Sequence, residues 1–116
     1  MTDKDPFAHL TPPNADDEDI HVTLMKQTAV ISWRELQRFF AAGKVIEVAR
    51  GVDLVNVGLA LVEDNAAAIK EWMDKEQVQI IHDTTAAQFV VTDASVWALA
   101  VAPWVLVQQV EPNTNG

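Results

Sequence analysis

Residues 32–49 read SWRELQRFFAAGKVIEVA, and in this stretch a helical pattern runs directly into a strand pattern. The Ser32 hydroxyl can cap one free backbone N–H of a helix, and the Glu35 carboxylate can reach back to another. Gly43 can adopt the left-handed conformation that ends a helix. Residues 44–49 are rich in β-branched side chains and predict a strand. The apolar side chains expected on one face of the helix are Trp33, Leu36 and Phe40.

The middle of the chain predicts two further helices, each preceded by a polar capping residue. Asp53 can cap a helix over residues 54–62, although this stretch is apolar nearly all round and also fits a buried strand. Its length favours the helix. Asn65 can cap a helix over residues 66–75, in which the apolar side chains Ile69, Trp72 and Met73 form a stripe.

The last third of the chain predicts strands around one short helix. Residues 77–82 have the composition of a strand, and the polar residues 83–85 can cap the helix that follows. Residues 96–101 and 104–110 predict two strands, or one bulged strand, because Pro103 cannot donate a hydrogen bond within a ladder. Their nearly continuous apolar character indicates burial on both faces, near the centre of the sheet.

The alternation of helix and strand predicts a single α/β domain, with an α+β arrangement as the alternative. We expect two layers, about four strands and four to five helices, with the helices on one face of the sheet or on both. The predicted domain spans residues 20–110, between an acidic flexible tail over residues 1–19 and a frayed end over residues 111–116. A first helix is expected from near Asp16, and residues 29–31 fit either a brief strand or the entry to the next helix.

Composition and charge limit the classes of partner. The 116 residues include 17 acids against eight Lys and Arg, giving a net charge of −9, and such a surface repels nucleic acid. The longest apolar run, residues 96–107, is shorter than the roughly 18 residues that a membrane helix needs. The chain has no cysteine, which excludes disulfides and fits a reducing cytoplasm. The first residues also lack the pattern of a secretory signal, so we expect a cytoplasmic protein.

Residues able to support chemistry are few. The glycines match no phosphate-binding spacing and the histidines are scattered, so neither a cofactor nor a metal is expected. His82 and Asp83 place an imidazole and a carboxylate side by side at a strand end, although Asp83 also has a sufficient structural role as a helix cap. With Glu35 and Arg38 they form the candidate ligand-binding set. A small-molecule-binding protein or an enzyme with its site near His82 is the alternative hypothesis.

The apolar helix predicted over residues 54–62 suggests a homodimer. A helix that is apolar all round must be covered on more than one side, and a small domain has few layers to supply that cover. A second subunit is a natural source. Gly58 would let a neighbouring backbone approach closely, so the candidate interface residues are Leu54, Gly58 and Leu61.

Three stretches of the chain carry a resemblance to a known family. They are residues 31–43 (ISWRELQRFFAAG), 52–55 (VDLV) and 97–108 (WALAVAPWVLVQ). The positions of Trp, Gly and the tripeptide Ala-Pro-Trp in these stretches resemble those of a small bacterial family known as domain of unknown function 2288. The resemblance extends over roughly residues 22–110. The resemblance implies a stand-alone bacterial protein without an established cofactor, and it carries over no activity.

The leading functional hypothesis is a non-catalytic protein-interaction or regulatory module. The many apolar side chains and the acidic N-terminal segment favour such a module over an enzyme. The lack of a recognisable cluster of catalytic side chains favours it as well. The expected partners are a second copy of the chain and another protein.

Overall fold

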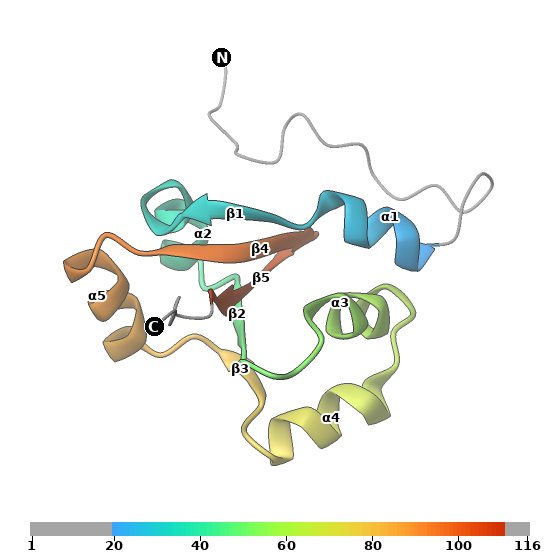
Figure 1. The fold of residues 1–116 in the computed structure, drawn as a ribbon. Helices are drawn as coiled ribbons and strands as arrows, with labels where there is room; N and C mark the ends of the chain where they lie inside the picture. Colours follow the sequence, from blue (N-terminus) through green and yellow to red (C-terminus); the bar gives the residue numbers. More distant parts are fainter. Residues whose placement is uncertain (1–19, 111–116) are drawn as a thin grey trace, which may run out of the picture.

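Five strands form one mixed sheet within residues 20–110, the part of the chain that this computed structural model describes (Figure 1). The strands are β1 (Ala29–Ser32), β2 (Val45–Val48), β3 (Val78–Ile80), β4 (Ser95–Val101) and β5 (Trp104–Gln109). Their order in the sheet is β1-β4-β5-β2-β3. Strands β2 and β5 pair in parallel, and the other neighbouring pairs are antiparallel. The predicted class is confirmed, with one strand more than the expected four.

Helices cover both faces of this sheet, which is the second of the two arrangements that the sequence left open. The helical elements are α1 (Ile20–Gln27), the 3-10 helix η1 (Trp33–Leu36), α2 (Gln37–Ala41), α3 (Leu54–Val62), α4 (Ala66–Asp74) and α5 (Asp83–Val91). Helices α1 and α3 pack on one face with α4 beside α3, whereas η1, α2 and α5 lie on the other (Figure 1). The sheet therefore lies between two helical layers, and the expected count of two layers becomes three.

The side chains of β5 show why its sequence is almost continuously apolar. Val105 and Val107 belong to the core beneath η1 and α5, which we call the first core, and Leu106 belongs to the core beneath α1 and α3, the second core. All three are buried. Strand β5 is the middle strand of the sheet, so alternating side chains enter opposite cores. The predicted central position of this segment is confirmed.

The segment that begins at Ser32 differs in detail from the single helix that was expected. The Ser32 hydroxyl accepts a hydrogen bond from the Arg34 backbone N–H, but η1 forms first and the α-helix follows it. Ser32 is also the last residue of β1 and pairs with Ser95, so its backbone belongs to the sheet. The return bond expected from Glu35 is not present among the described residues. Gly43 ends the helix with a φ of 75°, as predicted.

Residues 54–62 form a helix, α3, and Asp53 caps it by accepting hydrogen bonds from the backbone N–H groups of Val55 and Asn56. The sheet, α1 and α4 cover this helix within the same chain. Leu54 is only 5% exposed, and Gly58 faces the sheet, where an added Cβ would lie 2.8 Å from Leu99 Cδ2. The close approach at Gly58 is therefore made to the chain's own sheet rather than to a partner.

This packing corrects the predicted dimer interface. The chain itself supplies the cover that a second subunit was expected to provide, so Leu54 and Gly58 offer no surface to a partner. Leu61 alone of the three lines a surface groove, between α3 and α4.

Two predictions fall partly or wholly outside the described residues. These are the flexible tail over residues 1–19, with the helix start near Asp16, and the frayed end over residues 111–116. Residues 29–31, left open by the sequence, lie in β1. Between Ile20 and Val110, none of the helices has the length and hydropathy needed to cross a bilayer.

Candidate functional site

The four predicted ligand-binding residues are all exposed but do not form one site. Glu35 lies in η1 and Arg38 in α2, whereas His82 precedes α5 and Asp83 begins it. Asp83 lines a hollow of about 300 Å³ beside the end of α2, together with Phe40 and Gly43. The other three residues line none of the four main hollows of the described chain. The hypothesis of a site at His82 required such a hollow, so the structure gives it no support.

Three of these residues, Arg38, His82 and Asp83, have an ordinary structural setting. The Arg38 guanidinium lies 5.0 Å from the centre of the Phe39 ring, a cation–π arrangement. His82 occupies the N-cap position of α5 through its backbone, and its carbonyl accepts a hydrogen bond from the Ala86 N–H. Asp83, which was expected to be the cap, is instead the first residue inside the helix. A carboxylate there still complements the positive end of the helix dipole.

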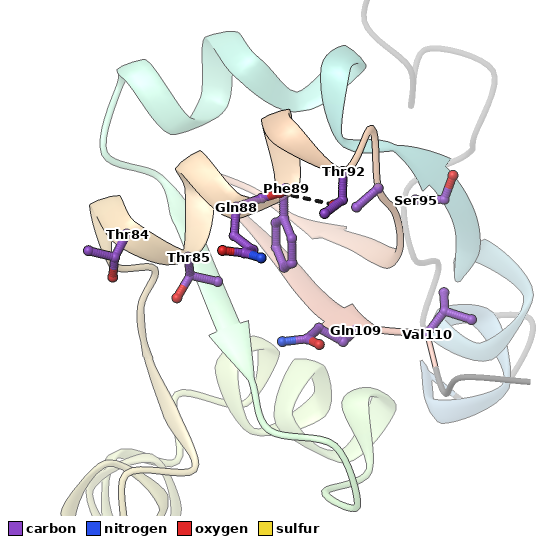
Figure 2. Close-up of a pocket in the computed structure, with 9 residues that line it drawn as sticks. Thr84, Thr85, Gln88, Phe89, Thr92, Ser95, Gln109 and Val110 are labelled. Carbon is purple, nitrogen blue, oxygen red and sulfur yellow. Dashed lines mark hydrogen bonds between the residues drawn. The ribbon is translucent and has the colours of Figure 1, made fainter. Parts of the chain in front are cut away.

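The largest of these four hollows lies elsewhere, between α5 and the ends of β4 and β5 (Figure 2). Its volume is about 560 Å³. The side chains around it are mostly uncharged hydrogen-bonding groups: Thr84, Thr85, Gln88, Thr92, Ser95 and Gln109, with Phe89, Ala94 and Val110 between them. Figure 2 shows Phe89 extending from α5 between Gln88 and Gln109.

Most of the polar groups around this hollow remain available for a ligand. The Thr92 hydroxyl donates to the Gln88 backbone carbonyl over 2.9 Å. The side chains of Thr85, Gln88 and Gln109 make no hydrogen bond to any other described residue. Each carboxamide offers two donors and one acceptor oxygen, and each hydroxyl offers both functions. No charged residue or histidine lines the hollow, so its chemistry is hydrogen bonding without an acid or a base of its own.

A second hollow of about 260 Å³ shares Gln109 with the first. It lies over β2 and β3, where Glu47 and Gln79 are directly opposite each other in the ladder. Arg50 and Glu76 stand at its rim. We call the two hollows together the polar trough.

The sequence analysis did not predict the polar trough, because no residue of the trough forms a recognisable motif with its neighbours in the sequence. Glu47 and Gln79 each interrupt a short apolar strand, VIEV and VQI, at a position whose neighbours along the strand are apolar. Polar residues at such positions indicate a sheet face that no helix covers. Only the strand pairing brings them together with Gln109, and sequence spacing does not reveal that pairing.

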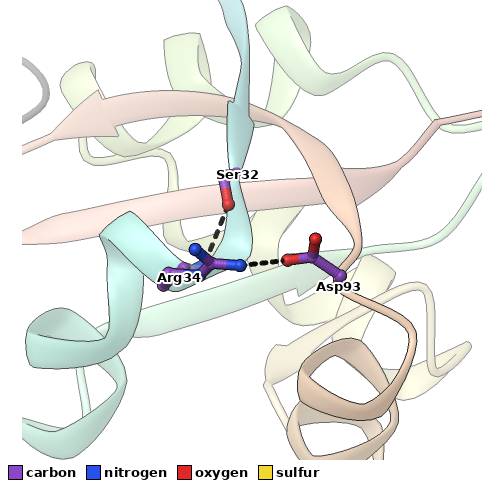
Figure 3. A network of polar contacts seen from close by, with 3 residues as sticks. All are labelled: Ser32, Arg34 and Asp93. Carbon is purple, nitrogen blue, oxygen red and sulfur yellow. Dashed lines mark hydrogen bonds and ion pairs between the residues drawn. The ribbon is translucent and has the colours of Figure 1, made fainter.

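An ion pair fixes the turn between α5 and β4 to η1, as Figure 3 shows. The Arg34 guanidinium lies 2.7 Å from the Asp93 carboxylate, and Ser32 accepts from the Arg34 backbone. Both charged side chains are largely exposed, so the pair contributes at most about 1 kcal/mol. A backbone hydrogen bond from the Trp33 N–H to the Ala94 carbonyl holds the same two segments together.

The remaining surface offers no metal centre. Among residues 20–110, no group of three or more His, Cys, Asp or Glu side chains is placed to hold a metal ion. The candidate site is therefore a polar binding surface, uncharged in its larger hollow and with Glu47, Arg50 and Glu76 in its smaller one, on a small mixed α and β domain.

Comparison with known proteins agrees with this description. The chain belongs to the family described as "Protein of unknown function (DUF2288)", which it matches over residues 19–109. It is similar to the NMR solution structure of PA1075 from Pseudomonas aeruginosa, with a TM-score of 0.73 and 33% sequence identity. That match covers 87% of this chain and 94% of the other. No curated protein matches the chain.

Proposed function

We propose that the protein is a non-catalytic interaction module that pairs with a second copy of itself through the outer edge of β1. The observation that carries this proposal is an exposed Trp–Val pair beside an open strand edge. The absence of cysteine from the sequence supports a reducing, cytoplasmic setting, and the family resemblance supports a bacterial one. The net charge of −9 argues against nucleic acid as a partner.

Strand β1 stands at one end of the sheet and pairs only with β4 among the described residues. Its outer edge therefore presents backbone N–H and C=O groups that another strand can bind. Charged side chains and proline commonly protect such edges. The four residues of β1, Ala-Val-Ile-Ser, include neither.

The side chains next to this edge favour a protein partner. Val30 is 49% exposed and lies directly opposite Trp97 of β4, which is 39% exposed. Tryptophan is enriched at interfaces, where it often supplies a large share of the binding energy. Antiparallel pairing of two β1 strands about a twofold axis would extend the sheet across both copies and bring the two Val30–Trp97 pairs onto one continuous face.

The opposite edge of the sheet provides a matched control. Strand β3 has three residues, and its Ile80 is 47% exposed, almost as much as Val30. A lysine at either position adds one charge to an exposed edge strand without entering a core. Val30→Lys should abolish the dimer because two charges would face each other across the twofold axis, whereas Ile80→Lys should leave it intact.

Light scattering after size exclusion at micromolar concentration tests this proposal. The unaltered chain and Ile80→Lys should give twice the chain mass of 12.8 kDa, and Val30→Lys should give the monomer mass. Far-UV circular dichroism checks that both variants are folded. A monomeric unaltered chain at high concentration contradicts the proposal, as does equal loss of the dimer in both variants.

A protein partner besides the second copy is part of the same proposal, supported by the acidic composition, which favours association with basic surfaces. Affinity capture from a bacterial lysate, with and without residues 1–19, tests it. Val30→Lys as bait then shows whether such a partner uses the β1 edge. Repeated absence of any enriched protein would argue against this part of the proposal.

A further inference from the structure

We propose that the polar trough binds a neutral oligosaccharide. This inference is independent of the β1 dimer, because the residues that carry it lie on α5, β2, β3 and β5. It assigns a ligand class to a surface that the proposed interaction does not use.

The shape of the trough suits an elongated ligand. Its two hollows, of about 560 and 260 Å³, share Gln109 and are lined by residues from four strands and a helix. Gln109 follows Val107 on β5 by two residues and so points to the same face of the sheet. Val107 in turn pairs with Glu47, which pairs with Gln79. A ligand in the trough would cross β5, β2 and β3 in turn.

The chemistry of the lining fits hydroxyl groups. Gln88 and Gln109 each present donors and an acceptor, and the hydroxyls of Thr84 and Thr85 add more of both. A ligand that carries many neutral groups of the same mixed kind can satisfy them together. Glu47 adds an acceptor in the smaller hollow, where a sugar hydroxyl would donate to it.

The same lining argues against the other ligand classes. An anionic ligand would find no cation in the larger hollow, would meet Glu47 and Glu76 beside the one arginine of the smaller hollow, Arg50, and would approach a chain with a net charge of −9. An extended peptide gains specificity from pockets that receive alternate side chains. The larger hollow offers only Val110, which is 40% exposed, as an open apolar side chain, because Phe89 is 6% exposed and Ala94 is small.

Titration of the ¹⁵N-labelled full chain, followed by NMR, tests the proposal. The probes are the linear trisaccharides of glucose and of N-acetylglucosamine, with the trisaccharide of glucuronic acid as the charged comparison and a hexapeptide of Ser, Gly and Gln as the peptide comparison. The side-chain NH₂ signals of Gln88, Gln109 and Gln79 report binding directly. At least one neutral trisaccharide should shift all three signals and saturate.

Two variants test whether the trisaccharide binds in the polar trough. Gln109→Ala removes the side chain common to both hollows and should raise the Kd about five- to tenfold, the effect of losing one or two neutral hydrogen bonds. Gln37→Ala removes another exposed glutamine, which begins α2 and lines neither hollow, so it should leave the Kd unchanged.

Several results would overturn the proposal. They are the lack of any saturable shift with both neutral trisaccharides, stronger binding of the charged trisaccharide, and shifts at the three glutamines with the hexapeptide alone. Equal weakening by Gln109→Ala and Gln37→Ala would place the binding outside the trough.

Discussion

The two faces of the sheet are covered to different extents. On the face of the second core, α1 and α3 close over Ile46, Leu99 and Leu106, and Gly58 lets α3 pack closely against the strands. On the other face, η1, α2 and α5 close over the first core but leave Glu47, Gln79 and Gln109 in open hollows. The comparison indicates that one face of the sheet supplies stability, whereas the other combines stability with an accessible polar surface.

Two of the elements on the open face are short. Helices α3 and α4 have nine residues each, and so does α5 on the open face, but η1 and α2 have only four and five. The short elements anchor Trp33 and Leu36 but cannot reach the far ends of β2 and β5. The uncovered strand positions carry polar side chains, as expected where a sheet meets water.

The largest effect is expected from a substitution that leaves a cavity in the second core. Leu106 on the middle strand is fully buried, so Leu106→Ala should lower the free energy of unfolding by about 2–5 kcal/mol through lost contacts and a cavity. Urea denaturation at fixed protein concentration measures the loss. A cost below about 1 kcal/mol would show that the closed face is not tightly packed.

The close approach at Gly58 provides a second test. Gly58→Leu should cost about 1–3 kcal/mol, because the larger side chain must displace Leu99 and push α3 from the sheet. Thermal unfolding at several protein concentrations separates this effect from any loss of association. If the variant keeps its stability as a monomer but no longer dimerises, then Gly58 faces a partner after all.

Two neighbouring glutamines on β5 allow a finer comparison of the faces. Gln108 donates to the backbone carbonyls of Ala49 and Val52, over 2.9 and 2.6 Å, and so ties β5 to the segment before α3. Gln108→Ala should therefore cost about 1–2 kcal/mol, because it removes both bonds, and only the Ala49 carbonyl keeps another donor, the Val52 N–H. Gln109→Ala on the polar side should stay within about 0.5 kcal/mol. If Gln108→Ala and Gln109→Ala lowered the free energy of unfolding equally in urea denaturation, this prediction would be wrong.

Local patterns predicted most of the elements because each rests on a few neighbouring residues. Asp53 and Asn65 cap the helices expected of them, and Gly43 ends its helix with a positive φ. The division of the last apolar segment at Pro103 gives two paired strands. In each case the determining interaction spans only a few positions, so the sequence contains it directly.

Features that depend on distant residues were harder to predict. The role of Gly58 depends on Leu99, some forty positions along the chain, and composition alone suggested a partner there. The candidate site was placed near His82, whereas the main hollow joins α5 to the end of β5. Strand order decides both features, and the hydrophobic pattern of each strand contains no information about its neighbours.

The residues that follow three of the helices have a consequence for engineering the surface charge. Asp64, Glu76 and Asp93 follow α3, α4 and α5 with φ values of 57°, 60° and 52°, a left-handed conformation that suits glycine better. The backbone N–H of each closes its helix by donating to a carbonyl three residues earlier, as Gly43 does after α2. Glycine at these three positions would keep those bonds and relieve backbone strain. At Asp64 and Glu76 it would also remove two negative charges, so part of the chain's acidity can be varied separately from its fold, whereas at Asp93 it would remove the ion pair with Arg34 as well.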